Sequence, residues 1–336
     1  MRASSIVRAF KEKYLGKTDV LSPGFFEDYE SELKRFTKET DLSDYRYCYS
    51  EPGTYPLKKG DHKFYRALKK AKVPLGVFYR DACWKFGIWS PRMLRCGKEK
   101  FLKKYEKDLK IYDKYCDTVF FPTESFSDEI SLKVRKEILP PGAFTHNLPS
   151  ASGYEKKALI YVGGLNDRFG YDIILKIFDQ LKNIEKFRMI IICRKSELEG
   201  SEKKRIEELD KDKVLFASSD FSGISKYYEK ASVALIPRKT DNYYNHIAFP
   251  VKLPEYLSFG LPVVCTSCKE QKKFVNENGY GKACETVEDI ISSVKSLVED
   301  ENLYSRFFNN IKDTFAESHS WRSRVDKIEA ILTERL

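Results

Sequence analysis

The chain has 336 residues, of which 42% are hydrophobic and 33% are charged, with a net charge of +10. This composition excludes a disordered, collagen-like or low-complexity chain, and the length fits two domains of ordinary size. The charge is uneven: residues 1–150 hold 30 Lys and Arg against 21 Asp and Glu, whereas residues 151–336 hold 30 against 29. The first half is therefore the basic half.

The sequence has no apolar run long enough to span a bilayer, and its first residues lack the apolar core of a signal peptide. We therefore expect a cytoplasmic protein. The cysteines lie mostly in apolar runs, as Cys193 and Cys265 do, which indicates buried thiols and not a disulfide framework. Cys265 and Cys268 form a lone CxxC without a nearby histidine, so no metal site is expected there.

In the first half, the apolar positions between Ile6 and Tyr14 predict an opening helix. Short strands are expected at 18–21, 45–49, 75–79 and 118–121, and a long amphipathic helix at 102–116. The Pro-Pro-Gly sequence at 140–142 breaks the pattern, and the polar stretch 147–157 indicates an interdomain linker. The expected domains are 1–151 and 152–318, with a final helix at 319–336.

The second half alternates strands with helices. Short β-branched runs predict strands at 158–162, 189–193, 213–217, 233–237 and 262–266. Such alternation is typical of parallel βαβ units, and this half is predicted to be a doubly wound α/β domain. Helices are expected at 287–298, 303–315 and 321–332.

Two segments of the second half carry chemistry. The strand at 158–162 leads into Gly163 and Gly164, and a helical pattern begins at Tyr171. A strand, a glycine-bearing loop and a helix N-terminus can bind a diphosphate, although glycines also simply close βα turns. In the second segment, a short helix between Pro254 and Gly260 is expected to carry Glu255 in its first turn.

Glu255 suits a ribose diol, because a carboxylate accepts two hydrogen bonds, and Lys252 beside it suits a phosphate. The alternative is a solvated Lys/Glu pair. The segment resembles the donor-site signature of GT-B glycosyltransferases, in particular the retaining, family 4-type enzymes that include many bacterial polysaccharide transferases. The residues that carry the resemblance are Pro250-x-Lys252-x-x-Glu255-Tyr256-Leu257-x-x-Gly260-x-Pro262-Val263-Val264.

The resemblance extends to the segments at 161–165, 139–142 and 320–321 and, more thinly, to those at 78–86 and 119–123. It implies two Rossmann-like domains facing across a cleft, with the donor bound by the second domain and the acceptor by the first. The final helix is expected to cross back to the first domain. By this resemblance Glu255 would hold the ribose, and Gly163 and Gly164 would lie under the diphosphate of a UDP- or GDP-sugar. The cations that would neutralise it are Arg168, Arg194, Arg238 and Lys252.

Three departures from the family pattern stand out. Ile247 occupies the place of a second glutamate, and Gly164 and Phe169 occupy places usually held by an arginine and a lysine. The stretch from Arg2 to Tyr14 is already helical in pattern, so the first domain is expected to lack its first strand.

On the acceptor side, Asp81 is the candidate proton acceptor, and Asp81 and Lys252 are the two catalytic candidates. Further acceptor-side candidates are Gly53, Tyr55, Arg80 and Trp84. An Arg80/Asp81 pair that closes a strand end is the alternative. His246 is expected in a solvent-facing loop.

The Asp210-Lys211-Asp212 sequence is expected in a solvated turn, so a metal-bound diphosphate is not expected. Residues 58–110 hold 17 Lys and Arg against 5 Asp and Glu, interleaved with aromatic residues. This region is expected to contact anionic lipids or a lipid-linked acceptor, and a solvated helix face over core aromatics is the alternative. Nucleic acid is not an expected partner, since no reader motif is present.

The sequence therefore predicts a glycosyltransferase that needs neither metal nor cofactor, takes a nucleotide sugar, and acts on a glycan or lipid-linked acceptor. A peripheral position at the inner face of the membrane is expected from the basic region. Two other functions stay open: a catalytically inactive partner subunit that binds nucleotide sugar, and a nucleotide-sugar 2-epimerase.

Overall fold

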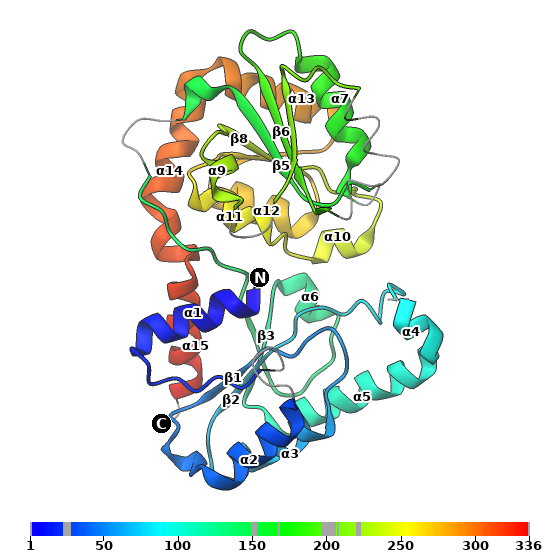
Figure 1. Cartoon of the computed structure of the whole chain (residues 1–336), viewed down its shortest axis with the longest axis vertical. Coiled ribbons are helices and arrows are strands. Elements are labelled where there is room, and N and C mark those ends of the chain that lie inside the picture. Colours follow the sequence, from blue (N-terminus) through cyan, green and yellow to red (C-terminus); the bar gives the residue numbers. More distant parts are fainter. Residues whose placement is uncertain are drawn as a thin grey trace. The chain divides into compact units, whose positions relative to one another are not determined.

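The computed structural model describes residues 2–22, 28–89, 91–148, 153–166, 169–195, 206, 208–219 and 223–334. The chain divides into two compact units, shown in Figure 1. The N-unit comprises Arg2–Pro140 together with Trp321–Leu336, and the C-unit comprises Pro141–Ser320. The division lies ahead of the boundary expected near residue 152.

The C-unit contains a parallel sheet of six strands in the order β10-β9-β8-β5-β6-β7. The predicted parallel α/β sheet is thereby confirmed. One strand, β10, was not predicted, because Gly-Lys-Ala-Cys contains no β-branched or aromatic residue. The strands are β5 (Ala158–Val162), β6 (Arg188–Cys193), β7 (Val214–Ser218), β8 (Val233–Ile236), β9 (Val263–Thr266) and β10 (Gly281–Cys284).

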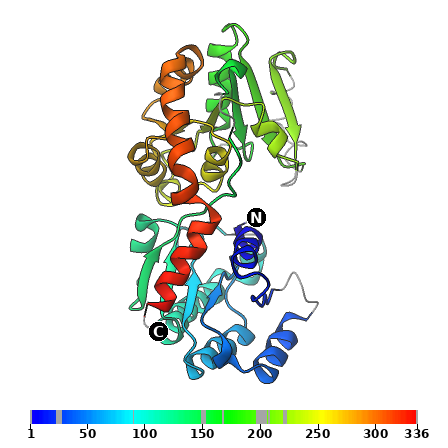
Figure 2. The same ribbon diagram turned by 90° about the vertical axis from the view of Figure 1, so that its left-hand side faces the viewer.

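Helices cover both faces of this sheet, as the continuous apolar strands require. Leu159 and Tyr161 of β5 belong to one core with α7 and α13, whereas Ile160 and Val162 belong to another with α9, α11 and α12. The helix α14 contributes to both cores and runs along the C-unit (Figure 2). The helices are η2 (Tyr154–Lys156), α7 (Tyr171–Leu181), α9 (Ser225–Tyr228), α10 (Tyr243–Ile247), α11 (Lys252–Ser258), α12 (Lys269–Glu277), α13 (Val287–Glu299) and α14 (Glu301–His319).

The N-unit contains a second parallel sheet, of four strands in the order β1-β2-β3-β4. The strands are β1 (Cys48–Ser50), β2 (Leu75–Phe78), β3 (Thr118–Phe121) and β4 (Arg135–Ile138). The helices are α1 (Arg2–Tyr14), α2 (Tyr29–Glu39), η1 (Leu42–Asp44), α3 (Lys59–Lys70), α4 (Pro91–Cys96), α5 (Lys98–Tyr115), α6 (Glu124–Asp128) and α15 (Trp321–Thr333). Both units are therefore Rossmann-like.

Two strand predictions in the N-unit are wrong: one predicted strand does not exist, and another begins later than expected. Residues 18–21 form no strand, and Asp19 there accepts a hydrogen bond from the Tyr45 hydroxyl. The strand expected at 45–49 begins only at Cys48, because the Leu42–Asp44 turn ends at Tyr45, whose N–H bonds back to Leu42. Among the described residues no strand precedes Cys48.

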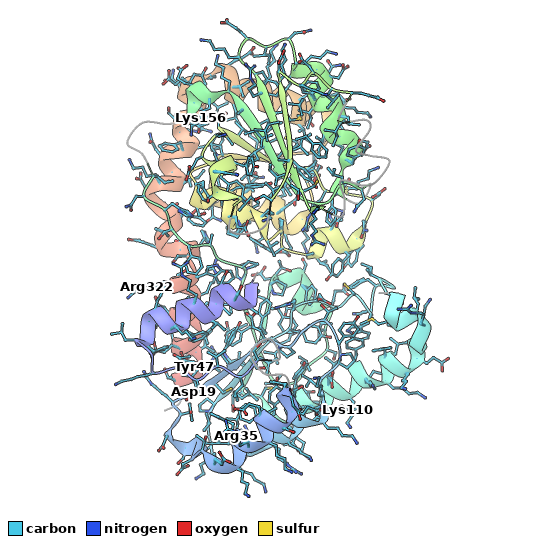
Figure 3. All side chains as sticks on the ribbon, viewed as in Figure 1. Asp19, Arg35, Tyr47, Lys110, Lys156 and Arg322 are labelled. Atoms are coloured by element: carbon cyan, nitrogen blue, oxygen red, sulfur yellow. The ribbon has the colours of Figure 1, made fainter. Side chains whose placement is uncertain are left out.

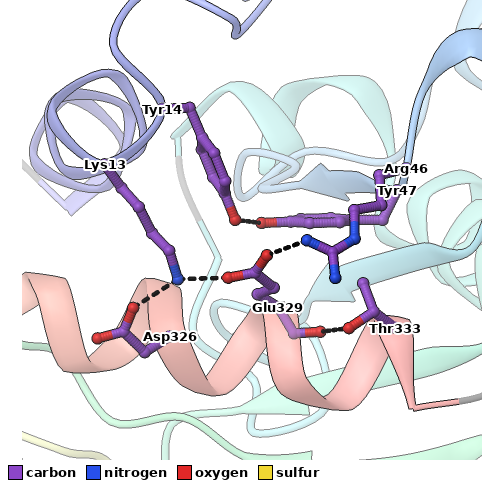
Figure 4. A network of polar contacts seen from close by, with 7 residues as sticks. All are labelled: Lys13, Tyr14, Arg46, Tyr47, Asp326, Glu329 and Thr333. Carbon is purple, nitrogen blue, oxygen red and sulfur yellow. Dashed lines mark hydrogen bonds and ion pairs between the residues drawn. The ribbon is translucent and has the colours of Figure 1, made fainter.

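The last helix, α15, packs on α1 and β2 within the N-unit. Lys13 of α1 pairs with Asp326 and Glu329 of α15, and Glu329 also pairs with Arg46 at 2.6 Å (Figure 4). The Tyr14 and Tyr47 hydroxyls hydrogen-bond beside this network at 2.7 Å. These polar contacts hold α15 to α1 and to the segment before β1. Within the described ranges, no helix is long and apolar enough to cross a membrane.

Candidate functional site

The carboxyl ends of the C-unit strands contain the point at which the order of the strands reverses. From β5 the chain continues to β6 and β7 on one side, and it then returns to β8 on the other side of β5. In open parallel sheets, ligands bind at the carboxyl edge where the strand order reverses. The loops that begin at Gly163, after β5, and at Pro237, after β8, both leave this point.

The glycine loop after β5 is held by hydrogen bonds to β6 and to its own strand. The Gly163 N–H donates to the Ile192 carbonyl at 3.0 Å, and the Tyr161 hydroxyl donates to the Gly164 carbonyl at 2.7 Å. A Cβ at Gly163 would collide with that Tyr161 hydroxyl. The glycine is therefore needed for the Tyr161 side chain, a reason that the sequence interpretation did not include. The predicted cation Arg168 lies outside the described residues.

A third glycine, Gly170, governs the entry into α7. It precedes the helix with φ +75°, and a Cβ there would collide with the Pro237 carbonyl of the segment after β8. The two loops of the reversal point are thus in direct contact. Phe169, at a position where a lysine was expected, donates its N–H to the Asn166 carbonyl at 3.1 Å and so belongs to the turn.

Glu255 lies in the first turn of α11, as predicted, and its side chain is 15% exposed. Its Oε2 accepts hydrogen bonds from Lys252 Nζ at 2.7 Å and from the Tyr228 hydroxyl at 3.0 Å. No described residue donates a hydrogen bond to Oε1. One carboxylate oxygen, Oε2, is therefore held by two hydrogen bonds within the protein. The other, Oε1, is left to accept a hydrogen bond from a ligand.

The sequence interpretation missed two tyrosines that hold Glu255 in place. The Tyr256 hydroxyl accepts a hydrogen bond from the Val162 N–H, at the end of β5, at 2.8 Å. Tyr228 packs edge-on against Tyr256 with ring centroids 5.6 Å apart. Burial raises the pKa of both tyrosines well above the ordinary value, so both hydroxyls stay protonated. Tyr256 therefore ties α11 to the end of β5, directly before the glycine loop.

Two predicted cations follow strands of the same sheet. Arg194 follows β6 and is exposed, whereas Arg238, after β8, is half-buried and donates from Nη1 to the Ala248 carbonyl at 3.3 Å. The Arg238 carbonyl in turn accepts from Thr266 Oγ1 at 2.6 Å. The backbone at Arg238 is therefore fixed at the carboxyl edge of the sheet.

Ile247, at the place of a second glutamate, lies in α10 and is only 1% exposed, so it belongs to the core. His246 is in α10 and not in a loop, which corrects the expectation. Its Nε2 bonds to the Thr240 carbonyl at 2.6 Å and its Nδ1 accepts from the Lys269 N–H at 3.2 Å. Both ring nitrogens are thus used within the protein.

In the N-unit, the acceptor-side candidates follow β1 and β2 at the carboxyl edge of the sheet. Asp81 accepts a hydrogen bond from Thr54 Oγ1 at 2.9 Å, so the loops after the two strands are tied together. Within the first loop, Gly53 has open space around it and Tyr55 is 44% exposed. Arg80, which precedes Asp81, is 36% exposed.

Trp84 forms part of the packing behind this edge. Its ring stacks on Tyr105 with centroids 5.3 Å apart, and its Nε1 donates to the Tyr79 hydroxyl at 3.0 Å. The Tyr105 hydroxyl donates to the Thr54 carbonyl at 2.7 Å. Trp84 therefore supports the loop that carries Gly53 and Tyr55.

Other features of the sequence have structural roles. Asp210 accepts from the Asp212 N–H at 2.9 Å in an exposed turn, and Cys265 and Cys268 are unbridged and buried. Within the described ranges, no group of three potential ligand residues is arranged to hold a metal ion. A cavity of about 670 Å³ lies at the opposite, amino edge of the C-unit sheet, lined in part by Lys156, Arg188 and Lys213.

The basic region 58–110 separates into charged and aromatic parts. The lysines of α3 and α5 are exposed, including Lys110, labelled in Figure 3. Of the aromatic residues on the same helices, Tyr65 and Tyr105 are only 3% and 6% exposed, whereas Phe64 and Phe101 are half-buried. The positive charge is thus on the surface, whereas the rings of Tyr65 and Tyr105 belong to the interior.

Residues 149–314 match the family Glycosyl transferases group 1. No curated protein matches the sequence significantly. Among solved structures, TarM has a TM-score of 0.63 at 12% identity, over 91% of this chain and 59% of TarM. The chain therefore spans about three fifths of the length of TarM.

Two further structures show the same fold. WaaG, a glycosyltransferase involved in lipopolysaccharide biosynthesis, has a TM-score of 0.55 at 14% identity, over 90% of this chain and 96% of WaaG. The pneumococcal O-GlcNAc transferase GtfA, solved with UDP and GlcNAc, has a TM-score of 0.52 at 14% identity, over 80% of this chain and 54% of GtfA. Residues 149–314 therefore match the glycosyl transferases group 1 family, and the whole chain has the GT-B fold of glycosyltransferases.

Proposed function

We propose that the chain is an active glycosyltransferase that moves a sugar from a UDP- or GDP-sugar to a glycan, polysaccharide or lipid-linked acceptor. The observation that carries the proposal is the placement of Glu255. Its unoccupied Oε1 lies on a helix that Tyr256 ties to the end of β5, directly before the glycine loop, at the carboxyl edge of a sheet where ligands bind. A ribose hydroxyl is a suitable donor to that oxygen. UDP in the GtfA structure favours a uridine donor.

The chemistry requires that negative charge on the leaving diphosphate be stabilised. Lys252, Arg194 and Arg238 supply cations at this edge, and the first N–H groups of α7 supply oriented donors. We propose that these groups are sufficient, so that transfer proceeds without a metal ion. Retention of the anomeric configuration is proposed from the family resemblance alone.

The acceptor is proposed to bind at the carboxyl edge of the N-unit sheet. Asp81, fixed by Thr54, is the proposed proton acceptor for the attacking hydroxyl, with Lys252 serving the departing phosphate. Gly53, Tyr55 and Arg80 surround the same edge, where Gly53 leaves open space. The open space and the fixed carboxylate support this assignment.

A cytoplasmic location with attachment to an anionic membrane surface is proposed from the exposed lysines of α3 and α5. The lysines are exposed, whereas Tyr65 and Tyr105 are buried and Phe64 and Phe101 are half-buried, so we propose that the attraction rests mainly on charge. Co-sedimentation with vesicles that contain phosphatidylglycerol tests this. Binding should fall with added salt and in Lys103→Gln/Lys107→Gln/Lys110→Gln. Equal binding to neutral vesicles would contradict it.

Ile247 favours one alternative, a subunit that binds nucleotide sugar without turning it over. The buried side chain offers no polar group to the donor sugar. Such a protein would bind UDP or GDP but release no sugar in the presence of any acceptor.

The deciding experiment measures release of nucleoside diphosphate from a panel of UDP- and GDP-sugars, with and without oligosaccharide acceptors. The wild type should turn over at least one donor, and Glu255→Ala should lower that rate about tenfold or more, equivalent to about 1.4 kcal/mol. Glu288→Ala, on the exposed surface of α13, is the matched control and should keep the wild-type rate. Unchanged turnover in Glu255→Ala would remove Glu255 from the site.

A further inference from the structure

Three charged side chains meet at the carboxyl ends of β1 and β2 in the N-unit. Arg2 Nε and Glu51 Oε1 form an ion pair at 2.9 Å, and the two side chains are only 7% and 6% exposed. The Arg2 guanidinium carbon lies 3.5 Å from the centre of the Phe78 ring. Arg80 Nη2 lies 3.7 Å from Glu51 Oε2. The buried Arg2–Glu51 ion pair therefore lies next to a second arginine, Arg80.

Only some of the polar atoms of the Arg2–Glu51 pair make hydrogen bonds. Glu51 Oε1 also accepts from the Tyr49 hydroxyl at 2.8 Å, and Arg2 Nη2 lies 3.4 Å from the same hydroxyl. Glu51 Oε2, Arg2 Nη1 and Arg80 Nε are buried and make no hydrogen bond with the described residues. Unpaired buried polar atoms are rare in proteins and call for a specific partner.

Arg80 is the member of the cluster that a ligand can reach, because its side chain is 36% exposed whereas the other two are buried. Its contact with Glu51 at 3.7 Å is longer than a hydrogen bond, and no described residue accepts a hydrogen bond from it. The neighbouring Asp81 is bound to Thr54 at 2.9 Å and makes no ion pair with Arg80 in the described part of the chain. Two guanidinium groups and one carboxylate leave the cluster with an excess of one positive charge.

We infer that Arg80 forms an acceptor subsite for an oxyanion, a phosphate or carboxylate group carried by the acceptor sugar. The inference rests on the proposed function, since it names the chemical class of its acceptor. The planar guanidinium donates two parallel hydrogen bonds to such a group. Arg2 and Glu51 are positioning residues: they hold a fixed carboxylate beside Arg80, and the oxyanion satisfies the excess positive charge. Gly53, in the loop after β1, leaves open space at the same edge.

The tryptophans provide a local reporter for the test. Trp84, Trp89 and Trp321 all belong to the N-unit, so tryptophan fluorescence reports on this unit alone. The full chain is titrated with glucose 6-phosphate, glucuronate and neutral glucose as probes. At least one anionic probe should bind about tenfold more tightly than glucose, a difference that Arg80→Gln removes and Arg80→Lys keeps in part. Arg66→Gln, on the exposed face of α3, controls for general attraction to positive charge.

Equal affinity for all three probes, no binding of any probe, or an unchanged anion preference in Arg80→Gln would overturn the inference. The two anionic probes distinguish a phosphate from a carboxylate acceptor. In parallel, the thermal shift caused by UDP and GDP is measured on the wild type and on Arg80→Gln. If UDP or GDP shifts the melting temperature of the wild type but no anionic probe is preferred, only the subsite is rejected. If neither nucleotide shifts the melting temperature of the wild type, the proposed function is rejected.

Discussion

Glu51 of the N-unit and Glu255 of the C-unit both lie near the carboxyl ends of strands, and they differ in their bonding partners. Glu51 of the N-unit pairs with Arg2 at 2.9 Å, and Glu255 of the C-unit pairs with Lys252 at 2.7 Å. Arg2 and Glu51 are both at least nine-tenths buried, whereas Lys252 and Glu255 are 18% and 15% exposed. From this difference we expect Glu51 to stabilise the fold and Glu255 to bind the ligand, because the partner of Glu51 is more deeply buried than the partner of Glu255.

The largest expected effect is on the stability of the N-unit. Glu51→Ala leaves the buried Arg2 guanidinium without its carboxylate, which typically costs about 3–5 kcal/mol. Urea unfolding followed by tryptophan fluorescence measures this in the N-unit. Glu12→Ala removes an exposed ion pair with Arg8 and should cost only about 0.5 kcal/mol. A loss in Glu51→Ala no larger than in this control would show that Glu51 is not structural.

Glu255→Ala should affect ligand affinity more than Glu51→Ala does, and stability less. The affinity for UDP should fall about tenfold or more, because a ribose hydroxyl loses its acceptor. The free energy of unfolding should fall by about 1–3 kcal/mol, less than in Glu51→Ala, because Lys252 and the buried Tyr228 hydroxyl lose their acceptor. Calorimetry and circular dichroism measure the two quantities on the same sample. A large loss of stability with unchanged UDP affinity would reverse the roles of the two glutamates.

Tyr256→Phe tests the connection between α11 and the end of β5, directly before the glycine loop. The Val162 N–H would lose its acceptor in a buried position, at a cost of about 1–3 kcal/mol in the unfolding of the C-unit. UDP affinity should fall as well, because Glu255 is no longer fixed relative to the loop. Tyr243→Phe, at a side chain that is 56% exposed, is the control. Wild-type stability in Tyr256→Phe would show that this hydrogen bond does not hold α11.

The smallest effect concerns the pH dependence of the N-unit. The hydrogen bond from Lys13 lowers the pKa of Glu329 below its ordinary value of 4.5. A lowered pKa stabilises the fold above the unfolded pKa, and this contribution is lost as the pH falls through the folded pKa. Between about pH 5 and about pH 3, the wild type should therefore lose up to about 1 kcal/mol more stability than Glu329→Gln. Parallel loss in both proteins would exclude this contribution of Glu329.

The sequence predicts the C-unit better than the N-unit, for a physical reason. Strands such as β5 and β6 are buried on both faces, so their apolar residues are continuous and recognisable. In the N-unit, β4 has the sequence Arg-Lys-Glu-Ile and lies at the sheet edge, where polar residues are tolerated. The short run at 18–21 resembles a strand in composition but has no partner strand in the described part of the chain.

The candidate site is predictable only in part. Glu255 and Lys252 are close in sequence, and a local pattern brings them onto one helix turn. Tyr228 and Tyr256 contribute through contacts with other elements, and Arg2 reaches Glu51 across 49 positions. Such contacts depend on how elements pack, and no local pattern encodes them. The reason for a glycine at position 163 is by contrast a local one, the side chain of Tyr161 two positions before it.

The central claim is that the carboxyl edge of the C-unit sheet, around Glu255, binds the nucleoside diphosphate of a sugar donor. Titration calorimetry of the full chain with UDP, GDP and uridine tests it most directly. At least one diphosphate should bind about tenfold or more tightly than uridine, because the cations and N–H groups at that edge act on the phosphates. Absence of binding heat with UDP and GDP, or equal affinity for UDP and uridine with GDP silent, would contradict the account.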